Sequence, residues 1–204
     1  MLLIGLTGSI GMGKSTAANR FRTLGIAVVD ADAEVHKLYK GTAVAPIEAA
    51  FPGTTGPDGV DRQKLAAELL KDPSGFKRLE AIVHPLVFAA ERDLLQAEAA
   101  RGAAMAVLEI PLLMESGGEK RVDVTVVVSA DAAMQRQRVL ARPGMTAEKF
   151  EQILSRQVPD AEKRRRADFV VDTSRTIPET EAQIDKIVET LRGRSGTAYA
   201  RFWA

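Results

Sequence analysis

Short apolar runs alternate along the chain with longer segments in which apolar residues recur at helical spacing. A continuous apolar run of about four to eight residues is typical of a strand buried on both faces of a sheet. Helical spacing between such runs is typical of helices that cover those faces. The pattern therefore predicts an α/β fold in which helices flank a five-stranded parallel sheet. The predicted strands span residues 2–7, 26–29, 103–108, 122–128 and 168–171.

Residues 41–101 keep helical spacing and contain no convincing strand, which predicts a helical insertion between the second and third strands. The stretch 52–59 is rich in Gly, Pro and Thr and is expected to be an exposed loop. Pro85 is expected to open a new helix, because proline suits the first helical turn. A second helical segment, residues 131–158, follows the fourth strand, is interrupted at Pro143, and is predicted to be a lid.

These segments predict a single unit over residues 1–192 that is closed by a helix at 177–191. Its core comprises residues 1–40, 102–130 and 159–192, with the insertion at 41–101 and the lid at 131–158. The tail, residues 193–204, carries Tyr199, Phe202 and Trp203 and receives no assignment from the pattern.

The segment 8–15 has two glycines separated by four residues and followed by Lys14 and Ser15. This spacing is that of a phosphate-binding loop, and it lies between a predicted strand and a predicted helix, as the motif requires. Glycines allow backbone N–H groups to surround phosphate oxygens, and the helix that follows adds its own free N–H groups. The alternative is a glycine-rich turn that binds no ligand. The residues predicted to bind ATP are Gly8, Gly11, Met12, Gly13, Lys14, Ser15 and Thr16.

Acidic residues follow two of the predicted strands, at the sheet edge where ligands bind in open α/β folds. Asp30 and Asp32 follow the second strand, and either could instead cap the helix that begins there. Glu109 follows the third strand. It is predicted to support Mg²⁺ through a water molecule, because an acidic residue at this place often does so in phosphate-loop enzymes.

Several basic residues admit both a functional and a structural interpretation. Arg136, Arg138 and Arg142 in the predicted lid could approach phosphates or form a solvated face. His84 could be a ligand or a packed residue of the core. The run 163–166 could bind nucleic acid, but no interleaved aromatic residues accompany it, so we predict the exposed end of a helix.

Composition narrows the class of protein. The 204 residues include 28 Lys or Arg and 27 Asp or Glu, so there is no bulk charge that favours nucleic acid or a membrane surface. There is no cysteine, which excludes disulfides and thiolate metal sites and is compatible with the cytoplasm. The start of the chain lacks the charged region and cleavage site of a signal peptide, and no apolar run approaches the length of a membrane span.

Two further motifs lack the required context. Residues 72–75 match the acidic motif of GTPases but follow a helical stretch, and the guanine motif Asn-Lys-x-Asp is missing. Residues 116–119 match only part of the signature of transporter ATPases. The core and its insertion therefore favour a small-molecule kinase.

Taken together, these segments resemble the dephospho-CoA kinase family over nearly the whole chain, up to about Leu191. The most specific parts of the resemblance are Asp-Ala-Asp after the second strand, His84-Pro85, and the Pro-Leu-Leu-x-Glu segment that begins at Pro111. The segments that carry it are 5–8, 30–32, 59–62, 79–85, 110–115, 135–142 and 167–171, together with Leu65, Ile153 and Gln157.

The resemblance implies a P-loop NTPase core with a helical substrate-binding insertion and a helical lid. It implies transfer of phosphate from ATP to the ribose 3′-hydroxyl of dephospho-CoA, which gives CoA and ADP. Asp32 would be the catalytic carboxylate that orients this hydroxyl and accepts its proton late, Lys14 and Arg142 would neutralise the transferred phosphoryl group, and Ser15 would hold Mg²⁺. The residues implied to border the dephospho-CoA site are Asp32, His84, Pro85, Leu112 and Leu113.

The resemblance also implies a cytoplasmic enzyme, monomeric or a small homo-oligomer, with a small-molecule partner and no nucleic acid or membrane. The chain departs from the family at residues 172–174, where Asp-Thr-Ser replaces the usual Asn, and this leaves the adenine contact and base preference open. Two other functions stay open: a nucleoside or nucleotide kinase with the same core, and a nucleotide-dependent module that binds RNA through residues 163–166.

Overall fold

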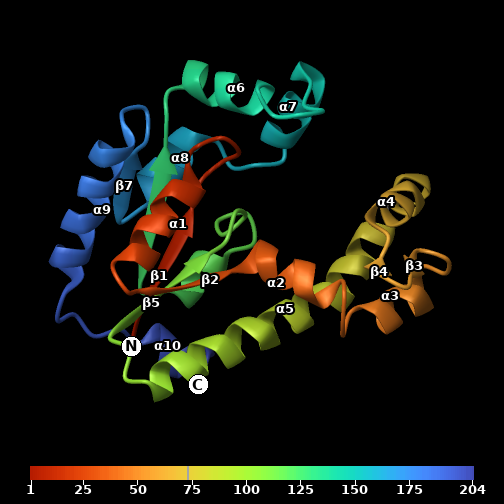
Figure 1. Cartoon of the computed structure of the whole chain (residues 1–204), viewed down its shortest axis with the longest axis horizontal. Coiled ribbons are helices and arrows are strands. Elements are labelled where there is room, and N and C mark those ends of the chain that lie inside the picture. The colour runs from red at the N-terminus through yellow and green to blue at the C-terminus, as the bar shows by residue number, and fades with distance from the viewer. Residues whose placement is uncertain (73) are drawn as a thin grey trace. The chain divides into compact units, whose positions relative to one another are not determined.

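The computed structural model describes residues 1–72 and 74–204. The chain divides into two compact units, one formed by Met1–Val29 with Leu95–Ala204 and the other by Asp30–Leu94. Figure 1 shows the elements coloured along the chain. Each unit is described below by itself.

The predicted five-stranded parallel sheet is confirmed. Its strand order is β2-β5-β1-β6-β7, so the first strand lies at the centre. β1 pairs in parallel with both β5 and β6, and β6 pairs in parallel with β7. All residues of β1 are buried, which explains why it is a continuous apolar run. The strands are β1 (Leu2–Thr7), β2 (Ala27–Asp30), β5 (Met105–Glu109), β6 (Val124–Ser129) and β7 (Phe169–Asp172).

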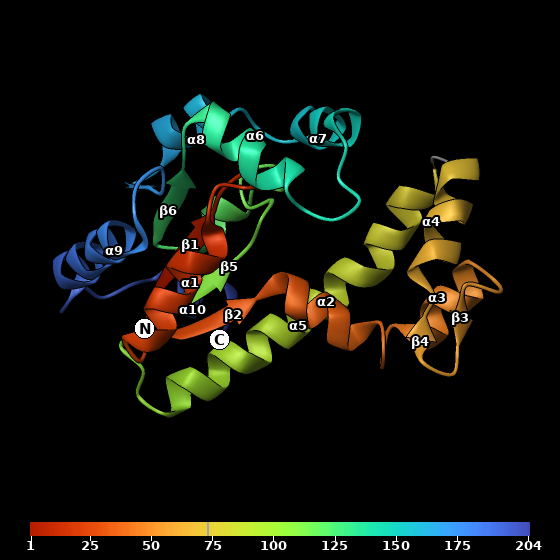
Figure 2. The same ribbon diagram turned by 45° about the horizontal axis from the view of Figure 1, so that its top comes forward.

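Helices of the first unit pack against the sheet. α1 and α9 lie side by side in Figures 1 and 2, and Arg20 of α1 donates two hydrogen bonds of 2.7 Å to Asp185 of α9. The core between helices and sheet includes Leu6, Phe21, Val126 and Ile184. The helices of this unit are α1 (Lys14–Thr23), α6 (Ala132–Leu140), α7 (Ala147–Leu154), α8 (Asp160–Arg166), α9 (Ile177–Leu191), α10 (Ala198–Phe202) and the 3-10 helix η1 (Gly118–Arg121).

The predicted helix at 177–191 is confirmed with the same bounds. Its N-terminus is fixed by a capping box, in which Thr176 Oγ1 accepts from Glu179 N–H and Glu179 Oε2 accepts from Thr176 N–H. The predicted Thr146 cap of α7 is also confirmed, since its hydroxyl oxygen accepts from Lys149 N–H.

The second unit is mainly helical and has its own core, which contains Ile47, Phe51, Leu65, Leu69 and Val83. Its elements are α2 (Ala31–Leu38), α3 (Val44–Ala50), β3 (Thr55–Gly56), β4 (Gly59–Val60), α4 (Arg62–Lys71) and the first part of α5 (Gly75–Ala100).

Two expectations for this region were wrong. The stretch 52–59 is not only a loop, because Thr55–Gly56 and Gly59–Val60 pair as a short antiparallel hairpin. Pro85 does not open a helix but lies inside α5. Both Pro85 and Ala81, whose carbonyl loses its helical partner at proline, are exposed, so solvent is available to that carbonyl. The GTPase-like stretch 72–75 follows helix α4, although its residue 73 lies outside the described part of the chain.

The tail that the sequence left unassigned is ordered and packs on the first unit. Trp203 is 1% exposed, and its indole N–H donates to Arg121 O at 2.9 Å. Before it, the carboxylate of Asp123 accepts from Thr197 and Ala198 and also from Leu3 of β1. The tail therefore closes the start of the central strand.

Candidate functional site

The phosphate-loop segment 8–15 leaves the centre of the sheet directly after β1. Gly13 has φ of 84°, and Gly11 has φ of 79°, both in the region that favours glycine. A Cβ atom at Gly8 would lie 2.3 Å from a methyl of Val128 and 2.8 Å from its carbonyl oxygen. The glycines are therefore required by backbone conformation and by close approach to β6.

The loop presents free backbone donors. Within the described residues, no protein acceptor faces the N–H groups of Gly11, Gly13, Lys14 or Ser15, whereas Met12 N–H donates to Ser9 O and Thr16 N–H to Gly13 O. The exposed Ser15 hydroxyl likewise has no hydrogen-bond partner in this part of the chain. A row of free N–H groups at the start of a helix is the arrangement that binds phosphate.

Lys14 is held inside this site by an acidic residue from the neighbouring strand. Its Nζ atom lies 2.6 Å from Glu109 Oε1, and Arg22 donates to the other oxygen, Oε2, at 3.3 Å. The Glu109 side chain is almost fully buried, so it fixes the two cations against the sheet. This explains why an acidic residue is needed at the end of β5.

Thr173, which directly follows β7, supports the loop. The buried hydroxyl of Thr173 donates to Met12 O at 2.8 Å, and Arg138 donates to Thr173 O at 2.7 Å. Met12 is itself part of the loop, but it is only 2% exposed, and its side chain belongs to the core. Arg138 is therefore committed to structure.

The three predicted lid arginines separate into different environments. Arg138 binds Thr173, and Arg136 forms an ion pair with Glu151 at 3.1 Å. Arg142 is exposed just beyond α6, and none of the described acidic residues pairs with it. Of the three, Arg142 is the one whose guanidinium is available to a ligand.

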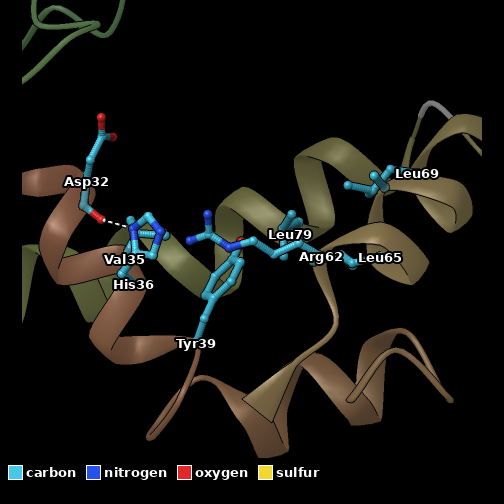
Figure 3. Close-up of a pocket in the computed structure, with 9 residues that line it drawn as sticks. Asp32, Val35, His36, Tyr39, Arg62, Leu65, Leu69 and Leu79 are labelled. Atoms are coloured by element: carbon cyan, nitrogen blue, oxygen red, sulfur yellow. Dashed lines mark hydrogen bonds between the residues drawn. The ribbon is translucent and has the colours of Figure 1, made fainter. Parts of the chain in front are cut away.

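The second unit contains a pocket of about 470 Å³, shown in Figure 3. Leu65, Leu69 and Leu79 form its apolar wall, and Asp32 and Arg62 supply charges of opposite sign. Figure 3 shows the Asp32 carboxylate directed away from the helix that carries it. Asp32 lies in the first turn of α2, and Asp30 is the N-cap because its Oδ1 accepts from Ala33 N–H at 3.0 Å. Asp30 thus takes the capping role and leaves the Asp32 carboxylate free for other contacts.

Three polar residues of the pocket, His36, Tyr39 and Arg62, were not proposed as site residues from the sequence. His36 follows Asp32 by one helical turn, and its Nδ1 lies 2.9 Å from Asp32 O. Tyr39 continues the same face of α2, and the Arg62 guanidinium lies over its ring at 5.2 Å from the centroid. Burial raises the pKa of the Tyr39 hydroxyl above 10.0, although the charge of Arg62 opposes the shift. The helical spacing 32, 36, 39 is the signal that marks this face.

The other residues predicted to bind the substrate do not line this pocket. His84 and Pro85 are exposed on α5 and do not line the pocket, and the interpretation of His84 as a packed core residue is wrong. Leu113 is fully buried and contacts the region of Gly5, whereas Leu112 is 47% exposed. Leu113 therefore belongs to the core, and only Leu112 is available to a ligand.

The basic run 163–166 ends helix α8, as predicted, but it is not uniformly exposed. Lys163 is fully buried, and its Nζ lies 2.8 Å from Glu115 Oε1. Arg165 pairs with Glu162, and Arg166 pairs with Glu119. The prediction of an exposed end is wrong for Lys163, because Glu115 supplies a charge partner in the interior.

Residues 1–72 and 74–204 contain no group of three or more His, Cys, Asp or Glu placed to hold a metal ion. No helix in the same residues has the length and apolar character of a membrane span. The Ser15 hydroxyl fits Mg²⁺ because this ion prefers few protein oxygens together with phosphate oxygens and water.

Solved structures share this fold. TT1252 from Thermus thermophilus is 36% identical with a TM-score of 0.80, covering 94% of this chain and 98% of that one. A shikimate kinase from Acinetobacter baumannii, 17% identical, shares the fold with a TM-score of 0.53 over 94% of this chain and 93% of its own.

Similarity in sequence identifies the family more specifically than the shared fold does. A family model described as dephospho-CoA kinase matches residues 2–179. The dephospho-CoA kinase of Rhizobium etli is 59% identical over 95% of this chain and 96% of its own length. That of Mesorhizobium japonicum is 54% identical over 97% of this chain and 100% of its own length. With a phosphate loop after its central strand and relatives that match from end to end, the chain belongs to the dephospho-CoA kinase family.

Proposed function

We propose that this protein transfers the γ-phosphoryl group of ATP to the ribose 3′-hydroxyl of dephospho-CoA, which yields CoA and ADP. Family membership identifies the acceptor, and the loop of free N–H groups beside Lys14 is the observation that carries the reaction type. Phosphoryl transfer needs positioning and charge stabilisation more than covalent chemistry, and a phosphate loop supplies both.

On the donor side, the free N–H groups of Gly11, Gly13, Lys14 and Ser15 hold the phosphates of ATP. Lys14 neutralises the β- and γ-phosphates, which requires its ammonium to exchange Glu109 for phosphate oxygen. Arg22 remains as a partner for Glu109 during this exchange. Gly8, Met12 and Thr16 complete the loop that the sequence assigned to ATP.

Ser15 is the residue that holds Mg²⁺ in this proposal. When bound, the ion neutralises charge on the phosphates and fixes their orientation. Glu109 would support the ion only through water, once Lys14 is paired with the phosphates. Both oxygens of Glu109 otherwise face cations.

On the acceptor side, the pocket of the second unit receives dephospho-CoA. Its leucine wall suits an apolar or aromatic part of the ligand, and Arg62 suits the diphosphate. Asp32 orients the 3′-hydroxyl and accepts its proton late in the transfer. His84, Pro85 and Leu112 were assigned to the same ligand from the sequence, and these assignments stay predictions. Leu113 was assigned to it as well, but its side chain is buried in the core.

Arg142 completes the proposed catalytic set. Its exposed side chain has no acidic partner among the described residues, in contrast to Arg136. A guanidinium that is free before the reaction can bind the transferred phosphoryl group without breaking an ion pair. The lid that carries it, the base preference, the oligomeric state and the cytoplasmic location stay predictions.

The decisive experiment offers three acceptors in parallel. The purified protein is supplied with ATP and Mg²⁺ together with dephospho-CoA, AMP or adenosine, and ADP release is followed. We expect ADP and a product heavier by one phosphate only with dephospho-CoA, and no turnover when Mg²⁺ is chelated. Turnover with AMP or adenosine alone would instead assign a nucleoside or nucleotide kinase. Salt-dependent RNA binding without transfer to any acceptor would assign the RNA-binding alternative.

A further inference from the structure

Both backbone polar groups of Ile10, in the phosphate loop, are held by glutamine side chains. Ile10 N–H donates to Gln157 Oε1 at 3.1 Å, and Gln135 Nε2 donates to Ile10 O at 2.8 Å. Gln135 lies on α6 and Gln157 follows α7, so the two glutamines come from opposite ends of the segment 131–158. The loop is thus tied to both ends of the predicted lid.

The chemistry of the groups fixes the direction of these two hydrogen bonds. A backbone N–H can only donate and a carbonyl oxygen can only accept, so Gln157 must present its oxygen and Gln135 its nitrogen. Gln135 is 5% exposed and Ile10 is half-buried, so the carbonyl oxygen of Ile10 is costly to leave without its donor. The two glutamines therefore have opposite and non-interchangeable roles.

A buried ion pair fixes the segment that carries Gln157. The next residue, Val158, donates its N–H to Glu115 Oε1 at 2.9 Å, and the Lys163 ammonium lies 2.8 Å from the same oxygen. Lys163 is fully buried, and removal of one member of such a pair leaves an uncompensated charge. The backbone next to Gln157 is thus fixed by buried contacts, which holds Gln157 in position beside Ile10.

We propose that Gln135 and Gln157 are positioning residues that hold the two peptide groups flanking Ile10, and through them the free N–H groups of the loop, in the form that binds nucleotide phosphates. Ile10 directly precedes Gly11, which has φ of 79° and, as a glycine, allows the chain to turn if the Ile10 backbone rotates. A fixed Ile10 backbone removes that freedom before the nucleotide arrives, which lowers the cost of binding. The inference rests on the proposed phosphate site.

The opposite roles allow a matched test with one type of substitution. Gln157→Glu keeps an oxygen that accepts from Ile10 N–H, whereas Gln135→Glu removes the donor to Ile10 O and sets two acceptors against each other. Both variants add one negative charge beside the same residue, Ile10, so the effect of the charge cancels when they are compared. Gln137→Glu, on the exposed face of α6, is the control for added charge in the lid.

The measurement is the Kd of ADP by calorimetry, together with KM for ATP and for dephospho-CoA and the Tm without nucleotide. We expect Gln135→Glu to bind ADP about 5- to 150-fold more weakly than Gln157→Glu, the fold-change that corresponds to about 1–3 kcal/mol for an acceptor left without its donor. Gln157→Met, which has no acceptor of comparable strength, is expected to weaken ADP binding relative to wild type. In Gln135→Glu and Gln157→Met we expect KM to rise for ATP and not for dephospho-CoA. Loss of fold stability alone would not change one KM without the other.

Equal ADP affinity in Gln135→Glu and Gln157→Glu would overturn the inference, as would wild-type affinity in Gln157→Met. If wild-type protein itself bound no ADP, the proposed phosphate site would fail instead, so the two failures are distinct. Should Gln135→Glu not fold, Gln157→Met alone decides the question.

Discussion

Lys14 Nζ lies 2.6 Å from Glu109 Oε1, and this pair links the phosphate loop to the end of the neighbouring strand β5. The ammonium is therefore held beside the free N–H groups of the loop before any phosphate is present. Because Arg22 lies on the second oxygen of Glu109, the carboxylate keeps a cationic partner when Lys14 moves to the nucleotide. The arrangement prepares the lysine without leaving a buried charge alone.

Replacement of Lys14 by methionine tests its part in the transfer. Lys14→Met removes the charge and keeps most of the side-chain volume, so we expect turnover to fall by at least about 100-fold. Steady-state ADP release with dephospho-CoA as acceptor is the measurement, and Lys149→Met, on the exposed part of α7, controls for loss of a surface lysine. Turnover near the wild-type rate would show that the phosphate site is wrongly assigned.

Asp32 is tested against its neighbour Asp30. Asp32→Asn is expected to reduce kcat by about 100- to 10,000-fold, because the amide cannot accept the proton of the 3′-hydroxyl. ATP affinity, measured by titration of the nucleotide alone, should be unchanged. Asp30→Asn is the matched control, since asparagine caps a helix as well as aspartate does, and it should retain activity. Equal kcat in the two variants would remove Asp32 from catalysis.

Arg62 is predicted to bind the acceptor and not the donor. Arg62→Ala removes the guanidinium that lies over Tyr39 in the pocket, so we expect KM for dephospho-CoA to rise about 10-fold or more. KM for ATP should stay unchanged. Lys64→Ala removes a charge from the same helix outside the pocket and provides the control. A parallel rise of both KM values would contradict a pocket dedicated to the acceptor.

The sheet and the phosphate loop were accessible to sequence reasoning because each depends on local pattern. Buried parallel strands need continuous apolar runs, and the glycines at 8, 11 and 13 meet backbone requirements that no other residue type satisfies well. The closing helix α9 was predicted with its observed bounds because its apolar residues recur at helical spacing and Pro178 suits its first turn.

Features that depend on tertiary partners were missed. Burial of Lys163 requires Glu115, which lies far away in sequence, so a local basic run without interleaved aromatic residues was placed at the surface. The continuity of α5 through Pro85 depends on the exposure of that position. In the pocket, the contact between Tyr39 and Arg62 depends on the packing of α4 beside α2. No local sequence pattern predicts that contact.

Arg142 is tested against Arg136 on the same segment. Arg142→Ala is expected to lower kcat by at least about 100-fold while the Kd of ATP changes little, because the charge acts on the phosphoryl group in transfer. Arg136→Ala removes an ion pair with Glu151 on the surface and should leave kcat unchanged. Equal kcat values in the two variants would favour the solvated-face interpretation for both arginines.

The tail is predicted to stabilise the first unit without a part in catalysis. Trp203 is fully packed and its indole N–H binds Arg121 O, so Trp203→Ala creates a cavity and leaves that carbonyl without its donor. A large-to-small change of this kind costs about 3–5 kcal/mol of unfolding free energy, which for a domain of this size lowers Tm by roughly 6–20 °C.

Thermal unfolding followed by circular dichroism measures the effect of Trp203→Ala, and Arg201→Ala, at an exposed position of α10, is the control. Because the tail closes the start of β1 whereas the phosphate loop follows its end, kcat and both KM values of Trp203→Ala should match wild type at a temperature well below its Tm. A Tm equal to that of Arg201→Ala would show that the tail is dispensable for stability. A fall in kcat without a fall in Tm would instead give Trp203 a role in the reaction.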